Sequence, residues 1–261
     1  ETTLDRMKAW AREGRRLGSH ATHRIAGFKI YPPMGFRPDS NSAMQLPQCS
    51  DPRDCRAATE VRNWWTGEGH GWDLSELGTE LDRSLDLFFR FCAQEDIPIM
   101  SHSRPSNGSM AGADWKALPH YWLNRARMVR EYGLHPLRAC LGHFDGRPEN
   151  AQVLIDGLRM NKAQTGGKPH ARLYFDVSFD DDILDGRPSN LLDSLASSCR
   201  EAEDNGDYIM FGSDWIMLGQ RSEAADYLRT FRDAASMHPF WHDKVDKLFR
   251  RNFIDFMNLP G

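Results

Sequence analysis

Residues 207–214 read DYIMFGSD, an apolar run that narrows to Gly212 and Ser213 and ends in the carboxylate of Asp214. The aromatic and aliphatic residues favour a buried β-strand, and the glycine, serine and aspartate are typical of the turn that follows one. In parallel α/β sheets, sites are built where the strands end. The prediction of the fold therefore depends on whether other apolar segments of the chain also end in turn-forming and ionisable residues.

Four more short apolar segments do so, and each of the five is followed by residues with apolar positions at helical spacing. Strict alternation of strand and helix predicts an α/β protein with a parallel sheet and helices outside it. The predicted strands are 25–31, 97–102, 137–143, 171–178 and 207–214. The predicted helices are 4–17, 77–92, 119–132, 151–158, 189–204, 224–235 and 245–256.

Composition excludes several classes of protein. The 33 basic and 37 acidic residues give a net charge of −4, spread along the 261-residue chain, which argues against a nucleic-acid or anionic-membrane surface. No stretch has the apolar length needed to span a bilayer, and the first residues lack the apolar region of a signal peptide. Cys49 and Cys55 share a polar loop, where they could form a local disulfide or half of a metal site, and we interpret them as unpaired thiols. Because a secretory signal is lacking, we expect a reducing compartment, the cytoplasm.

Residues 34–75 are rich in Pro, Gly, Asn, Asp and Trp, and this segment is too long for an ordinary connection. It predicts an insertion that serves function or forms a homo-oligomer.

Each predicted strand ends in side chains that can bind or react. In chain order they are Lys29 and Tyr31, His102, His143, Asp176 and Ser178, and Asp214. Because the carboxyl ends of parallel strands share one edge, we expect these side chains to meet there.

Side-chain alternation predicts that His102 shares the face of Met100 and His143 that of Leu141. By the same rule Asp214 shares the face of Met210 and Gly212, and Gly212 leaves room beneath the site.

Taken singly, these residues have structural explanations, since a strand-end histidine often serves only hydrogen bonding, and Asp176 or Asp214 could cap the next helix. As a set, His102, His143 and Asp214 form the nitrogen and oxygen ligand set of Zn²⁺ and related divalent ions. No glycine-rich nucleotide-binding motif and no G-x-S-x-G nucleophile motif is present. Ser213 is a weak nucleophile candidate, because Asp214 follows it directly and points to the opposite face.

The chain resembles the amidohydrolase superfamily, in its amidohydrolase-2 branch, along most of its length. The similar stretches are GFKIYPPMGFRP (27–38), IPIMSHS (97–103), LGHFDG (141–146), LYFDVS (173–178), IMFGSDW (209–215) and LFRRNFIDFMNL (248–259). The resemblance implies one (β/α)8 TIM-barrel domain over residues 1–261, incomplete at its N-terminus, with this chain supplying strands four to eight and lacking the first three β/α units.

By this resemblance His102 is a metal ligand, His143 is a ligand or polarises the substrate, and Asp214 binds metal and acts as the general base. Lys29 lines the site as a cation. The family's first-strand HxH pair is absent from the sequence. Three explanations stay open: the chain is the C-terminal part of a longer protein, another polypeptide supplies the missing strands, or the site lacks those ligands.

The leading hypothesis is a metal-dependent hydrolase acting on a small amide, lactone or ester. Its expected substrate-lining residues are Lys29, Tyr31, Arg37, Arg104, Asp176 and Trp215. One alternative is a nonoxidative decarboxylase of an aromatic or unsaturated carboxylic acid, with Arg104 holding the carboxylate. Another is a catalytically silent barrel or interaction module that uses the tryptophan-bearing segment NWWTGEGHGW (63–72).

Overall fold

The computed structural model describes nine parts of the chain. They are residues 5–6, 8–9, 26–32, 36–42, 74–104, 119–129, 135–144, 148–163 and 171–259. Most of the helix predicted at 4–17, most of the 34–75 segment with its tryptophans, and the thiols of Cys49 and Cys55 lie outside these residues.

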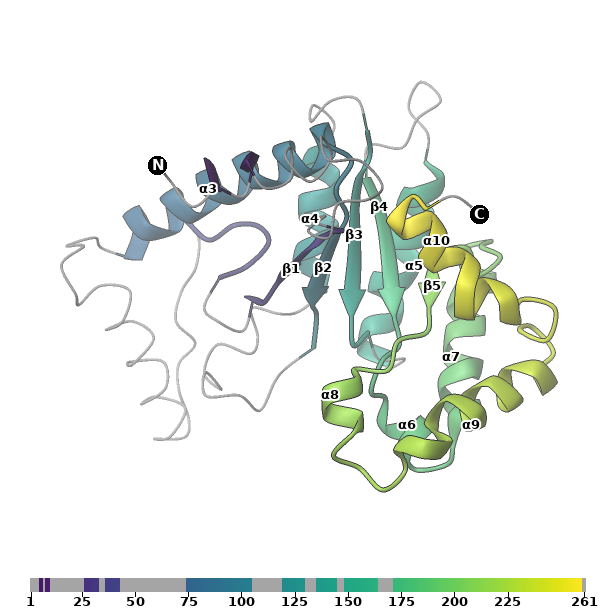
Figure 1. Cartoon of the computed structure of the whole chain (residues 1–261). Coiled ribbons are helices and arrows are strands. Elements are labelled where there is room, and N and C mark those ends of the chain that lie inside the picture. Colours follow the sequence, from purple (N-terminus) through teal and green to yellow (C-terminus); the bar gives the residue numbers. More distant parts are fainter. Residues whose placement is uncertain are drawn as a thin grey trace.

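A parallel sheet of five strands forms the centre of the molecule, with the strands in sequence order from one edge to the other (Figure 1). The strands are β1 (Phe28–Ile30), β2 (Ile99–His102), β3 (Leu137–Gly142), β4 (Ala171–Asp176) and β5 (Ile209–Met210). All four strand pairings are parallel. The predicted parallel α/β fold is confirmed, although β5 is much shorter than the segment predicted for it.

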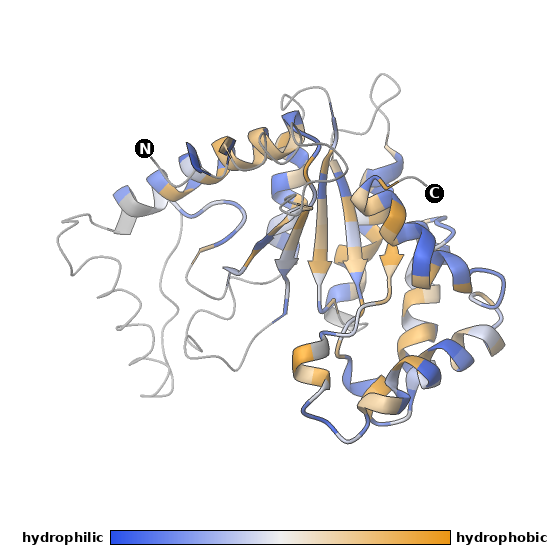
Figure 2. Ribbon diagram, viewed as in Figure 1, coloured by the Kyte–Doolittle hydropathy of each residue, from blue (hydrophilic) through white to orange (hydrophobic). Residues whose placement is uncertain are grey.

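Helices follow the strands as the alternation predicted. They are α3 (Leu74–Gln94), α4 (His120–Met128), α5 (Pro148–Lys162), α6 (Asp181–Leu184), α7 (Pro188–Glu201), α8 (Trp215–Leu218), α9 (Ala224–Met237), the π-helix η5 (Lys247–Arg251) and α10 (Asn252–Met257). The larger ones bury apolar stripes, and the strands between them are largely apolar (Figure 2).

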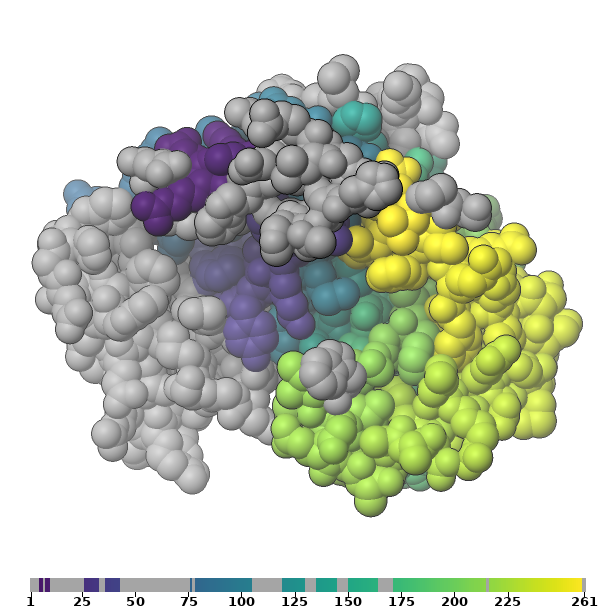
Figure 3. Space-filling view, in the orientation of Figure 1, coloured from purple at the N-terminus to yellow at the C-terminus, as the bar shows by residue number. Residues whose placement is uncertain are grey.

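The two faces of the sheet differ in what covers them. One face carries Ile99, Leu141 and Phe175, which pack with apolar residues of α3, α4, α5 and α7 in the main core. The opposite face carries Cys140 and Tyr174, which pack on the C-terminal helix α10 in a smaller cluster. In Figure 3, teal residues of the middle strands are visible between the purple of β1, the yellow of α10 and the green of α8. This second face leads to the strand ends.

The C-terminal segment covers the edge of the sheet beside β5. The carbonyl of Leu248 in the π-helix accepts a hydrogen bond of 2.8 Å from the backbone N–H of Phe211. The side-chain amide of Asn252 donates to the carbonyls of Gly206 and Ile209, at 2.7 Å each. One continuous helix was predicted here. The wider π turn interrupts it, and such turns are frequent at functional sites.

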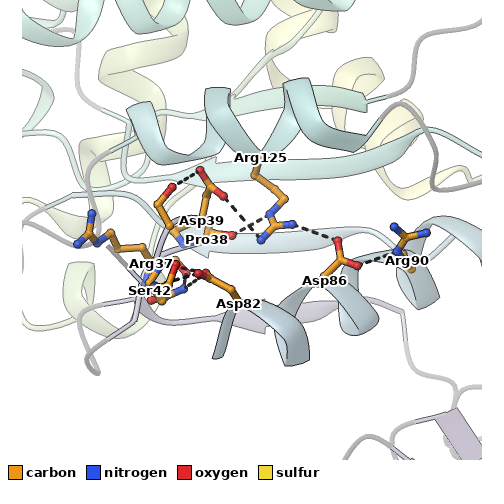
Figure 4. A network of polar contacts seen from close by, with 10 residues as sticks. Arg37, Pro38, Asp39, Ser42, Asp82, Asp86, Arg90 and Arg125 are labelled. Atoms are coloured by element: carbon orange, nitrogen blue, oxygen red, sulfur yellow. Dashed lines mark hydrogen bonds and ion pairs between the residues drawn. The ribbon is translucent and has the colours of Figure 1, made fainter. Parts of the chain in front are cut away.

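The segment after β1 is held between α3 and α4 by a buried polar network (Figure 4). Arg125 of α4 donates to the carbonyl of Pro38 at 2.9 Å and approaches carboxylate oxygens of Asp86 at 3.4 Å and Asp39 at 3.9 Å. A buried guanidinium needs such partners, because an unpaired charge in the interior is strongly unfavourable. The network therefore fixes the path of the chain as it leaves β1.

Candidate functional site

His102, His143 and Asp214 lie together at the carboxyl edge of the sheet. His102 is the last residue of β2, His143 follows β3, and Asp214 stands directly before α8. The centroids of the two imidazole rings are 4.8 Å apart. His143 Nε2 lies 3.7 Å from Asp214 Oδ2. Three strands that are separate in sequence thus place two nitrogen donors and one carboxylate side by side.

Left-handed backbone conformations at His143 and Asp214 set the direction of these two side chains. His143 has φ of 59° and Asp214 has φ of 45°, in a region that non-glycine residues seldom adopt and that is often associated with function. The prediction that His143 shares the face of Leu141 is wrong. Leu141 lies in the helix-covered core, whereas the ring of His143 lies beside His102, because the turn ends the alternation of the strand.

The backbone of Asp214 begins a helix while its carboxylate faces the site. Its carbonyl accepts hydrogen bonds from the N–H groups of Met217 and Leu218 at 2.9 and 3.0 Å. Asp214 therefore stands at the position of a helix N-cap, which is the structural explanation that the sequence also allowed for it. The side chain is one quarter exposed and points toward His143, so its carboxylate is accessible to a ligand.

His102 is held neutral by its surroundings. Burial, then the nearby His143, and to a smaller extent the charges of Lys29 and Arg104, lower its pKa to about 4, against an opposing hydrogen bond with the backbone of Arg104. Its Nε2 is buried and has no hydrogen-bond partner among the described residues. A neutral imidazole with one uncommitted nitrogen is the form that binds metals. The ring of Tyr31 covers His102 at a centroid distance of 4.7 Å.

His143 is anchored through its other nitrogen. Its Nδ1 lies 3.1 Å from the hydroxyl oxygen of Ser178 and 3.4 Å from the Ser178 carbonyl oxygen. The sequence placed Ser178 at the end of a strand but assigned it no role. Its position two residues after Asp176 is the signal, since a serine at this spacing can reach back to the carboxylate that ends the strand.

Asp176 ends β4 and is buried under the site. Burial raises its pKa, whereas hydrogen bonds from the hydroxyl and backbone of Ser178 oppose the rise. The backbone bond, from Ser178 N–H to Asp176 Oδ1, is 2.8 Å long. The alternative that Asp176 caps the next helix is wrong. Asp180 caps α6, and its carboxylate accepts the N–H of Asp182 at 2.9 Å.

Gly212 makes room for this carboxylate. A Cβ at position 212 would lie 2.4 Å from Asp176 Oδ2, closer than any side chain allows. The prediction that Gly212 leaves space beneath the site is confirmed, and the occupant of that space is Asp176.

The remaining residues predicted to line the site divide into two groups. Lys29 and Tyr31 are exposed, and both lie near His102, the first through its charge and the second through ring contact. Trp215 begins α8, and its side chain lies outside the described atoms.

Two arginines that were predicted to line the site have partners outside the set of His102, His143 and Asp214. Arg104 donates to the carboxylate of Asp181 at 2.8 Å and to the carbonyl of Phe179 at 3.3 Å, which ties it to the segment that begins α6. Arg37 was also predicted to line the site. Its guanidinium contacts α4, where it donates to the hydroxyl of Tyr121 at 3.3 Å. The buried network between α3 and α4 draws the chain there.

The donor atoms of His102, His143 and Asp214 are of the types that a divalent cation binds, but the distances between them are not those of a formed metal site. Within the described ranges, no three His, Cys, Asp or Glu side chains stand close enough together to hold a metal ion as they are. Instead, His143 pairs with His102 on one side and with Asp214 on the other. The orphaned Nε2 of His102 and the exposed carboxylate of Asp214 are donors of the kind that Zn²⁺ takes with an open coordination position.

Comparisons with protein-family models, with curated proteins and with solved structures found no match. In the part of the chain that the structure describes, no helix is both long and apolar enough to cross a membrane.

Proposed function

We propose that the protein is a metal-dependent hydrolase of the amidohydrolase type, which cleaves a small amide, lactone or ester by attack of water. The five parallel strands would correspond to strands four to eight of a (β/α)8 barrel. The observation that carries the proposal is the meeting of His102, His143 and Asp214 at the carboxyl edge of a parallel sheet. Enzymes built on such sheets place their reacting groups at this edge.

His102, His143 and Asp214 would hold the ion, and their two nitrogens and one oxygen favour Zn²⁺. When bound, the ion supplies Lewis acidity, which polarises a carbonyl group and makes water more acidic. The low pKa of His102, about 4, keeps its ring unprotonated at neutral pH. No proton therefore has to be displaced from His102 before it binds the ion.

Asp214 is the general base in this proposal. Its carboxylate accepts a proton from the attacking water and passes it to the leaving group, which is the usual work of a positioned acid–base side chain. Its partial exposure lets water reach it, and His143 Nε2 lies 3.7 Å from its Oδ2. Tyr31 and Lys29 are exposed and lie near His102, so they are suited to contact the substrate.

The test combines metal analysis with hydrolysis assays. We expect the purified protein to bind Zn²⁺ and to hydrolyse members of a panel of small esters, lactones and amides. His102→Ala, His143→Ala and Asp214→Ala should each lower zinc affinity and abolish hydrolysis. His242→Ala, a change to an exposed histidine outside the site, is the control and should alter neither. Full metal occupancy and full activity in all three site variants would overturn the proposal.

The decarboxylase alternative uses the same residues and differs in its need for a cation that holds a carboxylate. Arg104 was assigned that role, and its guanidinium is paired with Asp181 and the carbonyl of Phe179. This pairing favours the hydrolase. Release of carbon dioxide from aromatic or unsaturated carboxylic acids, without hydrolysis of the panel, would reverse the preference.

A further inference from the structure

We propose that Ser178 is a positioning residue that keeps His143 in the tautomer with its hydrogen on Nδ1, so that the lone pair of Nε2 faces Asp214. The inference rests on the proposed function only for its catalytic consequence. The tautomer itself follows from the contacts of the His143 ring with Ser178 and can be measured in the absence of any substrate.

The first step is the contact with the Ser178 backbone. His143 Nδ1 lies 3.4 Å from the Ser178 carbonyl oxygen. A carbonyl oxygen only accepts hydrogen bonds, so Nδ1 can satisfy this contact only when it carries the hydrogen. In a neutral imidazole, a hydrogen on Nδ1 leaves Nε2 with a free lone pair.

The second step is the contact with the Ser178 hydroxyl. Its oxygen lies 3.1 Å from His143 Nδ1, and a hydroxyl oxygen can accept a hydrogen bond. A ring that carries its hydrogen on Nδ1 therefore satisfies both oxygens of Ser178.

The third step is the rigidity of this arrangement. Asp176 is held by the backbone N–H of Ser178 at 2.8 Å, and it is confined on its other side by Gly212, where even a methyl group would lie 2.4 Å from Oδ2. His143 itself is only 11% exposed. The chain from Asp176 to Ser178 is thus held in place beside the ring of His143.

The consequence concerns the pair formed by His143 and Asp214. With the lone pair on Nε2, two acceptors face each other at 3.7 Å, an arrangement that attracts a cation or a hydrogen-bond donor between them. With the hydrogen on Nε2 instead, His143 would donate to Asp214, and the two groups would satisfy each other. Ser178 therefore keeps both groups available for a ligand.

The experiment measures the tautomer directly. The protein is labelled with ¹⁵N in its histidine rings, freed of metal with a chelator, and studied by long-range ¹H–¹⁵N NMR in mildly alkaline buffer. The spectrum of His143→Gln assigns the His143 signals. In the wild type we expect a pyrrole-type Nδ1 and a pyridine-type Nε2. Ser178→Ala should move the ring toward the Nε2–H form, and Ser178→Thr, which keeps the hydroxyl, should restore the wild-type pattern.

Ser236→Ala, which removes an exposed serine hydroxyl on α9, is the matched control and should leave the His143 signals unchanged. As a second readout, Ser178→Ala should weaken Zn²⁺ binding by about 10- to 100-fold, the usual effect of removing the partner of a metal-binding histidine, and Ser178→Thr should recover it.

An Nε2–H ring or a doubly protonated ring in the wild type would overturn the assignment, even if Ser178→Ala did not fold. A folded Ser178→Ala protein whose His143 ring kept the wild-type share of the Nδ1–H form would overturn the positioning role of the Ser178 hydroxyl, because this variant removes the hydroxyl and keeps the backbone carbonyl. A protein that showed the expected tautomers but hydrolysed nothing would refute the proposed function and leave the role of Ser178 standing.

Discussion

The carboxylate of Asp176 fills the space beside the backbone of Gly212, where a Cβ would lie 2.4 Å from Oδ2 and 2.6 Å from Oδ1. Gly212→Ala should therefore push Asp176 away from Ser178. We expect the free energy of unfolding to fall by about 1–3 kcal/mol, which is typical of overpacking in an interior. Urea unfolding followed by circular dichroism measures the change.

The clash is specific to one side chain, which a double-mutant cycle can test. In an Asp176→Ala background, the alanine at position 212 should be tolerated almost without loss, because its methyl group meets no carboxylate. If Gly212→Ala destabilised both backgrounds equally, the close approach to Asp176 would not be the cause.

His102 should make the metal-free protein less stable in acid. Its pKa is about 4 when folded, against an ordinary value of 6.5, because burial and neighbouring positive charge disfavour protonation. The unfolded chain therefore binds the proton more tightly. The penalty is absent above pH 6.5, grows as the pH falls toward 4, and stays constant below that.

Two measurements test whether His102 lowers the stability of the metal-free protein in acid. NMR titration of the metal-free protein should give His102 a midpoint near 4. His102→Gln removes the titrating group, so the variant should lose less stability than the wild type between pH 7 and pH 5. A midpoint at or above the ordinary value, or the same loss of stability in both proteins, would contradict the prediction.

Arg125 should be among the residues on which the fold depends most. Its side chain is 3% exposed and is bonded to the carbonyl of Pro38 and the carboxylate of Asp86 (Figure 4). Arg125→Met removes the buried charge together with its hydrogen bonds to these two acceptors, so we expect the free energy of unfolding to fall by about 3–5 kcal/mol.

Chemical denaturation measures the effect, with Arg83→Met as the matched control. Arg83 pairs with Glu80 on the surface of α3, and its side chain is 66% exposed, so its replacement should leave the unfolding midpoint almost unchanged. Equal losses in the two variants would show that the buried network is not what makes Arg125 important.

The order of the strands and helices was readable from the sequence because it depends on local patterns. Apolar runs and helical spacing predicted all five strands and the helices α3, α4, α5, α7 and α9 in their observed order. The lengths were less predictable. The segment predicted as a strand over 207–214 pairs only at Ile209 and Met210, because Phe211 bonds to the π-helix that the distant C-terminal segment forms.

Some of the reactive residues at the carboxyl edge of the sheet could also be predicted from the sequence. His102, His143 and Asp214 stand at strand ends in the sequence, and parallel pairing brings strand ends to one edge. Ser178 was named as a strand-end residue, but its role was not predicted, because that role comes from a contact with His143 across 35 positions of the chain. Arg37 was also assigned to the site, and its hydrogen bond to the hydroxyl of Tyr121 could not be predicted, because it joins residues 84 positions apart in the chain.

The sequence by itself determined the parallel α/β arrangement and the residue types at the strand ends. Hydrophobic periodicity locates the strands and helices, and therefore shows which residues end each strand. Only the tertiary structure decided where those side chains point. The left-handed turns at His143 and Asp214 override strand alternation, and burial between neighbouring strands sets the charge of His102 and the hydrogen bonds of Asp176. Periodicity carries no information on either, because both depend on residues that become neighbours only when the sheet has formed.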